Sequence, residues 1–234
     1  LGRALALYHA APGVSMSLWG RDRARLTATA EAARSAGAGV SQRILDLGDG
    51  EAAIAALLNE DRESPVDIAY LVAGMGDTRA AGDKVEDPQL VLRAAQVNFA
   101  VPAAMAAALA SQMAERGGGR IVLIGSAAGH HSLPFAASYA GSKAGLARFA
   151  DALRIAVKPH GVSITLAAPG FIATPANPRR ALDIPLDLAA RRIALAAEKG
   201  SRHHVTPWPF AMLRIVDALL PASLRDRLLS SLNP

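Results

Sequence analysis

Tyr139 and Lys143 stand four positions apart in Tyr-Ala-Gly-Ser-Lys, within a segment of helical periodicity. Residues at positions i and i+4 of a helix share one face, so the phenol and the ammonium are expected to be neighbours. A free tyrosine has a pKa near 10, and a nearby positive charge favours the phenolate. The pair therefore predicts a side chain that can give and take a proton near neutral pH.

Ser126 lies thirteen residues before Tyr139, at the end of a predicted strand with the sequence Arg-Ile-Val-Leu-Ile-Gly. Ligands of open parallel α/β sheets bind outside the carboxyl ends of the strands, so this hydroxyl is expected to reach the same site. Alone, Ser126 could be a satisfied hydroxyl at the end of a strand. In combination with Tyr139 and Lys143, it favours a proton-transfer site.

The elements that must position these side chains follow from periodicity. Apolar runs rich in β-branched residues alternate with longer helical segments, which is typical of βαβ units. We expect an α/β fold, a doubly wound parallel sheet with helices on both faces. The expected strands cover 14–19, 40–45, 67–73, 120–125, 162–167 and 203–206, and the expected helices cover 2–11, 23–36, 50–60, 86–115 with a break near Pro102, 137–157, 186–199 and 210–230.

Composition narrows the class of protein further. The 234 residues, 51% hydrophobic and 19% charged, suit one folded domain over 1–234 rather than a disordered chain. The net charge of +5 is scattered and only 4% of the residues are aromatic, so nucleic acid is not the expected partner. The absence of cysteine excludes thiol chemistry and fits a reducing compartment, so we expect a cytoplasmic protein.

Asn98, in Gln-Val-Asn-Phe-Ala-Val, completes a pattern with Ser126, Tyr139 and Lys143 that resembles the short-chain dehydrogenase/reductase (SDR) family. The resemblance implies a Rossmann fold and hydride transfer to or from a nicotinamide coenzyme. It implies that Tyr139 is the general acid or base and that Lys143 favours its phenolate and binds the nicotinamide ribose. Ser126 would hold the substrate oxygen. Asn98 would support a water that relays protons, although it could instead simply cap or brace a helix.

The resemblance also implies a set of coenzyme-binding residues. Arg21 stands where an arginine can pair with the 2′-phosphate of NADP, and the carboxylate typical of NAD enzymes is missing there, so NADP(H) is favoured and NAD(H) stays possible. Asp22, one residue later, is the feature that favours NAD(H). The other implied residues are Gly2, Asp46, Leu47, Ala73, Gly74, Tyr139, Lys143, Pro169, Gly170, Ile172 and Thr174.

The two ends of the sequence carry expectations of their own. The opening Leu-Gly-Arg-Ala-Leu-Ala reads as the first turn of a helix. A doubly wound fold needs a strand and a glycine-rich turn before that helix, so we expect about 10 to 15 preceding residues. The apolar tail at 207–234 is expected to form a helix packed on its own domain or on a twin subunit. Contact with a membrane surface is the alternative.

The substrate pocket is expected between three mostly apolar segments, 127–136, 175–187 and 207–213. This composition favours a hydrophobic or mid-sized carbonyl compound. His130 and His131 lie in the first segment without a nearby carboxylate or third ligand, so they are expected at the rim of the pocket rather than in a metal site.

These features predict an NADP(H)-dependent oxidoreductase that reduces a carbonyl or oxidises a secondary alcohol. SDR proteins are commonly dimers or tetramers, so the resemblance implies a homodimer or homotetramer. Two other functions stay open. One is a dinucleotide-binding regulatory protein without turnover, and the other is a reductase in a surface-polysaccharide pathway.

Overall fold

Strands and helices alternate along the chain, as the computed structural model shows for residues 1–76, 79–80, 82–173, 183–209, 212 and 219–230. The helices are α1 (Gly2–His9), α2 (Arg23–Ser35), α3 (Gly50–Glu63), α4 (Pro88–Ala95), α5 (Val101–Glu115), α6 (Ala137–Val157), α7 (Leu186–Glu198) and α9 (Ala222–Ser230). The strands are β1 (Ser15–Gly20), β2 (Gly39–Ile44), β3 (Ile68–Leu71), β4 (Gly119–Ile124), β5 (Val162–Pro169), β6 (Ile172–Ala173), β7 (Ile184–Pro185) and β8 (His203–Thr206).

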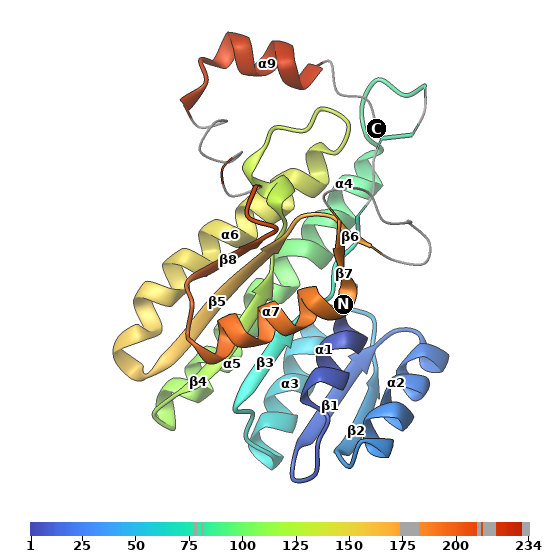
Figure 1. Ribbon diagram of the computed structural model, residues 1–234, viewed down its shortest axis with the longest axis vertical. Helices are drawn as coiled ribbons and strands as arrows, with labels where there is room; N and C mark the ends of the chain where they lie inside the picture. Colours follow the sequence, from blue (N-terminus) through green and yellow to red (C-terminus); the bar gives the residue numbers. More distant parts are fainter. Residues whose placement is uncertain (77–78, 81, 174–182, 210–211, 213–218, 231–234) are drawn as a thin grey trace.

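The main strands form a parallel sheet in two hydrogen-bonded parts (Figure 1). β1 pairs with β2, and β3, β4, β5 and β8 pair in that order, each pair parallel. Alternate residues of β4 face opposite layers, as the pleat requires. Ile121 and Leu123 pack with α3, α5 and α6, whereas Val122 and Ile124 pack with α1 and α7. The predicted doubly wound parallel sheet with helices on both faces is confirmed.

The predicted break near Pro102 is wrong by about one turn. The irregularity is a π-helical turn, Gln96–Ala100, between α4 and α5. Pro102 lies two residues after this turn, near the start of α5. Proline lacks an N–H and its ring crowds the carbonyl four residues earlier, so a distortion of the helix directly before it is expected. A π turn accommodates an extra residue that hydrophobic periodicity does not reveal, and such turns gather at functional sites.

Two other segments differ from what the sequence pattern predicts. The stretch after β5, where no strand is expected, contains the short parallel pair β6 and β7. The helix expected over 210–230 lies partly outside the described residues, and in the described part it is interrupted at Leu220 and Pro221 before α9 begins. Pro221 cannot continue a helix that arrives from its amino side.

The helical segment Pro88–Glu115 is long and apolar enough, by length and composition alone, to cross a membrane. Its second half is instead a core helix, because Leu109 and Met113 of α5 are completely buried among residues of β4, β5 and α6. Core packing therefore explains its apolar composition. The organisation of 1–234 as a single domain and the residues expected before Leu1 stay predictions.

Candidate active site

α6 carries Tyr139 and Lys143 on successive turns. The Nζ atom of Lys143 lies 6.0 Å from the centroid of the Tyr139 ring. Lys143 is only 4% exposed, and its ammonium donates a hydrogen bond of 2.9 Å to the carbonyl oxygen of Ile124, the last residue of β4. The half-buried Tyr139 keeps part of its surface open to solvent. The structure thus combines a fixed, buried cation with an accessible phenol.

Burial lowers the pKa of Lys143 to about 8. The ammonium has lost most of its hydration, and burial disfavours its charged form. It still carries a proton at neutral pH. In these less polar surroundings it attracts a neighbouring phenolate more strongly than it would in water.

Ser126 follows β4 and precedes the short 3-10 helix η2 (Ala127–His130). Its Oγ accepts a hydrogen bond of 3.2 Å from the N–H of Ala128, which leaves the hydroxyl proton available for another acceptor. Gly129 lets this loop lie directly on α6, because a Cβ there would come within 2.9 Å of the Lys143 carbonyl carbon and 3.0 Å of the Ala144 nitrogen. Close backbone packing therefore holds the serine loop on the helix that carries the pair.

Asn98 is completely buried in the π turn. Its Oδ1 accepts from the N–H of Met75 at 2.7 Å, and its Nδ2 donates to the Met75 carbonyl at 2.9 Å and to the Ser142 Oγ at 3.1 Å. Gly74 allows this arrangement, since a Cβ there would lie 3.2 Å from both Asn98 Oδ1 and Lys143 Nζ. The side chain of Asn98 thus braces the loop after β3 against α6.

Ser142 is a residue that sequence reasoning missed. Its hydroxyl donates to the Tyr139 carbonyl oxygen at 2.8 Å while it accepts from Asn98. Its position immediately before Lys143, inside the Tyr-Ala-Gly-Ser-Lys motif, is the signal that could have pointed to it. Ser142 links the buried asparagine to the turn of α6 that carries the tyrosine.

Most of the predicted coenzyme residues lie at or just after the ends of β1, β2, β3 and β5, at the carboxyl edge of the sheet (Figure 1). Arg21 is exposed directly after β1 and has no ion-pair partner among the described residues. Asp22, the feature favouring NAD(H), is the N-cap of α2, where its carboxylate accepts from the N–H of Arg25 at 3.0 Å. Capping of α2 therefore accounts for Asp22, and no contact with a coenzyme is needed to explain this residue.

The remaining predicted coenzyme residues lie on several loops and strand ends. Gly2 is the first residue of α1, whose N-cap residue makes no side-chain hydrogen bond to the helix. Asp46 accepts from the N–H of Gly48 at 2.9 Å and so shapes the loop after β2. Leu47 packs on the core, Ala73 and Gly74 follow β3, Pro169 ends β5, Gly170 follows it, and Ile172 lies in β6. Thr174 lies outside the described residues.

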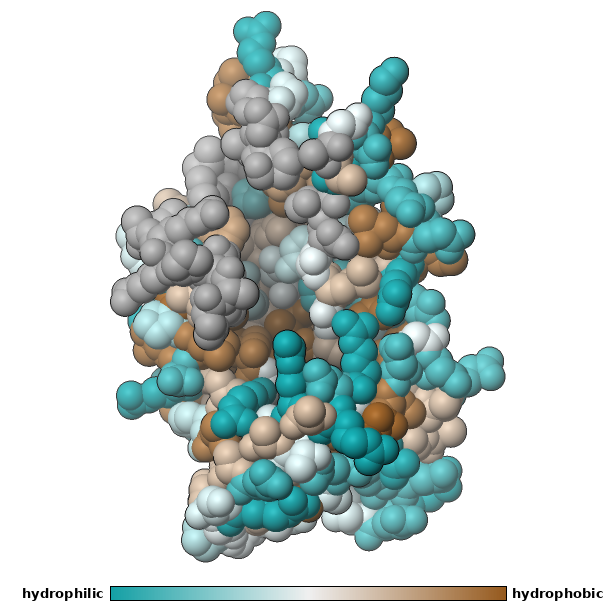
Figure 2. All heavy atoms as spheres, turned by 90° about the vertical axis from the view of Figure 1, so that its right-hand side faces the viewer, coloured by the Kyte–Doolittle hydropathy of each residue, from teal (hydrophilic) through white to brown (hydrophobic). Residues whose placement is uncertain are grey.

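Figure 2 shows the side of the molecule on which α2, β2 and α4 lie in Figure 1. The surface is hollowed near its centre, with hydrophobic and neutral atoms inside the hollow and hydrophilic atoms along the rim below it. Concave surfaces that mix apolar lining with a few polar groups are typical of small-molecule sites.

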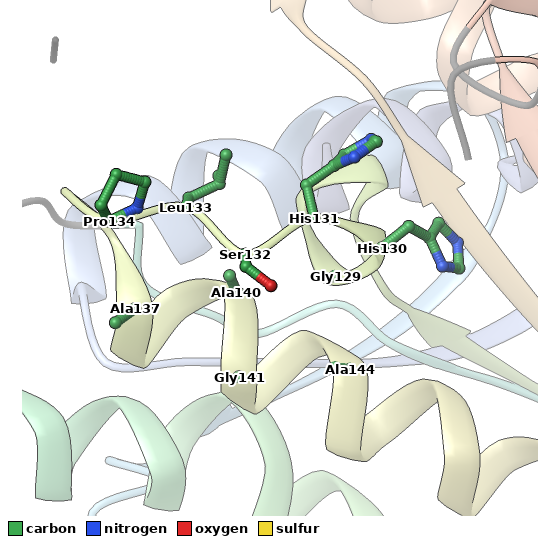
Figure 3. A pocket seen from close by; sticks show the side chains of 10 residues that line it. All are labelled: Gly129, His130, His131, Ser132, Leu133, Pro134, Ala137, Ala140, Gly141 and Ala144. Carbon is green, nitrogen blue, oxygen red and sulfur yellow. The ribbon is translucent and has the colours of Figure 1, made fainter. Parts of the chain in front are cut away.

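A cavity of about 470 Å³ lies between the loop at 129–134 and α6 (Figure 3). His130 and His131 stand at one end of this loop and Leu133 and Pro134 at the other, above the face of α6 that carries Ala137, Ala140, Gly141 and Ala144. The two histidines therefore line a pocket, and their expected place at the rim of the substrate pocket stays a prediction. Tyr139 and Lys143 are not among its lining residues, so it is separate from the proton-transfer pair.

Comparison with known proteins agrees with this fold. Residues 1–184 match the family model described as short chain dehydrogenase. A protein of Myxococcus xanthus named "Uncharacterized oxidoreductase" is 30% identical over 231 residues, which cover 97% of this chain and 90% of that protein. Dehydrogenase/reductase SDR family member 7B of Bos taurus is 34% identical over 182 residues, covering 74% of this chain and 55% of the bovine protein.

Solved structures share the same fold. A short-chain dehydrogenase from Sphingobium yanoikuyae in complex with NADPH superposes with a TM-score of 0.79 at 24% identity, covering 98% of this chain and 91% of the other. A bulky-bulky ketone specific alcohol dehydrogenase from Comamonas testosteroni has a TM-score of 0.79 at 21% identity, covering 98% and 89%.

The chain belongs to the short-chain dehydrogenase/reductase family. It is accordingly an oxidoreductase of a family that binds NAD(P) and acts on small molecules.

Proposed function

We propose that this protein is an NADP(H)-dependent oxidoreductase that reduces a carbonyl compound or oxidises a secondary alcohol. The observation that carries the proposal is the buried ammonium of Lys143, fixed on the Ile124 carbonyl one helical turn from Tyr139. Burying a charged group costs free energy unless its surroundings compensate it. A buried cation beside an accessible phenol is the arrangement expected of a proton-transfer site.

Each residue has a separate part in the proposed reaction. Tyr139 donates its phenolic proton to the carbonyl oxygen during reduction and takes the hydroxyl proton during oxidation. Lys143 stabilises the phenolate by its charge. Ser126 donates its free hydroxyl proton as a hydrogen bond to the same substrate oxygen, where negative charge develops. Asn98 braces the loop after β3 against α6, and the bound nicotinamide supplies or accepts the hydride.

The residues at the carboxyl edge of the sheet fit a dinucleotide that carries a 2′-phosphate. The first turn of α1 begins at a glycine and Leu1 gives it no side-chain cap, so the amino end of this helix suits phosphate oxygens. The exposed guanidinium of Arg21 suits a phosphate, which it can bind in a bidentate manner. The amino end of α1 suits the pyrophosphate of either coenzyme, whereas Arg21 favours NADP(H), and NAD(H) is the alternative.

The proposed substrate class rests on composition. The segments expected to wall the substrate pocket, 127–136, 175–187 and 207–213, are mostly apolar, which favours a hydrophobic or mid-sized carbonyl compound. We also propose that the enzyme acts in the cytoplasm, as a homodimer or homotetramer.

A panel of aldehydes, ketones and secondary alcohols, assayed by nicotinamide absorbance with NADP(H) and NAD(H) in parallel, tests the proposal. Wild-type protein should turn over at least one of these compounds. Tyr139→Phe should reduce kcat by at least about a hundredfold, because it removes the transferable proton, and should leave the dissociation constant for NADPH unchanged. Tyr8→Phe is the matched control, since Tyr8 is an exposed tyrosine of α1.

The outcomes separate the possible functions. Turnover that survives in Tyr139→Phe would show that another group transfers the proton. Tight dinucleotide binding without turnover of any compound in the panel would instead support a regulatory protein.

A further inference from the structure

The helix that carries the tyrosine begins without a cap of its own. The N-cap residue of α6 is Ala136, which makes no side-chain hydrogen bond, and the first turn contains no acidic residue. The first N–H groups of a helix have no partner within the helix. One of them, the N–H of Ser138, donates to the Oε2 atom of Glu86 at 2.8 Å. The cap of α6 therefore comes from a residue 52 positions earlier in the chain.

Glu86 is half-buried, and one oxygen of its carboxylate is shielded from solvent. Its Oε1 atom is buried and has no hydrogen-bond partner in the part of the chain that the structure describes. Taking a carboxylate oxygen out of water costs free energy. The partial positive charge at the amino end of α6 offsets this cost. Glu86 and the start of α6 therefore stabilise each other.

Glu86 and Asn98 contact α6 at two points one turn apart. Glu86 accepts from the N–H of Ser138, and the amide of Asn98 donates to the Oγ of Ser142. Each contacted serine immediately precedes one member of the proton-transfer pair. Both contacts come from one stretch of chain, because Glu86 lies two residues before α4 and α4 continues into the π turn that holds Asn98. The two contacts can thus fix two successive turns of α6 in position relative to this stretch of chain.

We propose that Glu86 is a positioning residue for Tyr139, an inference that rests on the proposed function. Tyr139 is the third residue of α6 and so belongs to the first turn, the part of a helix that frays most readily. The bond from Ser138 to Glu86 keeps that turn closed and keeps the phenol in its orientation beside Lys143. Glu86 acts through the backbone of α6 and touches neither substrate nor coenzyme.

Kinetics of two substitutions test this role. Glu86→Ala removes the acceptor and is expected to lower kcat about tenfold, because small displacements of reacting groups are costly, while the dissociation constant for NADPH stays unchanged. Glu86→Gln keeps an amide oxygen that can accept from Ser138, and it should retain most of the wild-type kcat. If Glu86 had only a structural role, Glu86→Ala would lower the amount of folded protein, and Glu86→Gln would bring no recovery in kcat.

Asp87→Ala is the matched control. Asp87 is the neighbouring acidic residue and caps α4, where its Oδ1 accepts from the N–H of Gln89 at 2.9 Å. Removing either cap should lower the melting temperature to a similar extent. Only Glu86→Ala should lower kcat, and a tenfold loss in Asp87→Ala would overturn the inference.

A readout without turnover keeps this inference distinguishable from the proposed function. In protein with 13C-labelled tyrosine rings, the NMR signal of Tyr139 is assigned by its loss in Tyr139→Phe. We expect Glu86→Ala to shift and broaden this signal and Glu86→Gln to restore it. A wild-type signal in Glu86→Ala would overturn the positioning role. If the wild-type protein turned over no compound of the panel, the proposed function would fail while this measurement still decided the role of Glu86.

Discussion

At the scale of single residues, burial of the Lys143 ammonium makes the free energy of folding less favourable, and the proposed role of this residue explains why the protein bears that cost. Its ammonium is 4% exposed, and burial lowers its pKa to about 8. The unfolded chain has the ordinary lysine value near 10.4. Below pH 8 both states carry the proton, so the folded protein bears the full cost of the buried charge. Between about pH 8 and 10.4 the folded state binds fewer protons, and this cost is progressively relieved as the pH rises.

Replacing Lys143 by methionine should therefore stabilise the protein at pH 7 and abolish turnover. A pKa lowered to about 8 means that the buried charge destabilises the folded state by roughly 3 kcal/mol. Methionine removes this cost but also loses the hydrogen bond to Ile124, which contributes about 1 kcal/mol. We expect a net gain of about 2 kcal/mol in the free energy of unfolding, measured by urea denaturation. The gain should shrink as the pH rises from about 8 to 10.4. A Lys143→Met protein less stable than wild type at pH 7 would contradict this account.

Coenzyme choice is also a property of single residues. Arg21→Ala should raise the KM for NADPH roughly tenfold to a hundredfold, the range expected when a charge-assisted hydrogen bond to phosphate is lost. The KM for NADH should change little, because NADH lacks the 2′-phosphate. Arg23→Ala is the control, since Arg23 is an exposed arginine in the first turn of α2. Equal losses with both coenzymes would place Arg21 outside the phosphate site.

At the scale of elements, the site depends on how closely the loop after β4 approaches α6. The contact is made through backbone atoms, so neither side can yield by moving a flexible side chain. Ser126 lies three residues before the contact at Gly129. The packing of η2 on α6 therefore decides how far the serine hydroxyl lies from the phenol of Tyr139.

Gly129→Ala should separate these two elements. The added Cβ would meet the Lys143 carbonyl carbon at 2.9 Å, and we expect kcat to fall at least tenfold and the free energy of unfolding to drop by about 1 to 3 kcal/mol. Gly141→Ala is the control on the same helix, because a Cβ there meets nothing within 4 Å and alanine favours helix by about 1 kcal/mol. Kinetics and thermal unfolding of both variants check the prediction. A fully active Gly129→Ala enzyme would show that the loop tolerates displacement.

At the scale of the whole molecule, one cluster attaches the last strand of the main sheet to α6. Asp151 of α6 accepts from Arg202 at 3.1 Å and bonds to the ring of His203 at 2.8 Å, at the start of β8. Burial by itself raises the pKa of Asp151, but the hydrogen bonds from Arg202 and His203 outweigh it and lower the pKa to about 2. The cluster thus favours the ionised carboxylate in the folded state.

This cluster predicts how stability depends on pH. Because the folded pKa of Asp151 lies below the unfolded value near 3.9, its contribution is present above about pH 4 and is lost as the pH falls toward 2. Asp151→Asn should therefore melt at a lower temperature than wild type at pH 7. The difference should narrow in acid, as melting curves at several pH values would show. A constant difference down to pH 2 would contradict the ionic origin of this contribution.

Several features of the fold and site could be predicted from local sequence. Alternating apolar runs and helical segments indicated the parallel sheet, and the helix at 137–157 agrees with α6. The π turn could not be predicted, because one extra residue in a helical turn barely changes the hydrophobic period. The partners of Asn98 could not be predicted either, since they lie 23 and 44 residues away in the chain.

The amino-acid sequence by itself determined the class of fold and the pairing of Tyr139 with Lys143, because both depend on short-range spacing. Only the tertiary structure decided that the lysine is buried, that Asn98 serves as a brace and that Glu86 caps the helix of the tyrosine. Each of these depends on segments distant in sequence coming together around one helix. Their free energies arise from burial and hydrogen bonding, which no local pattern specifies.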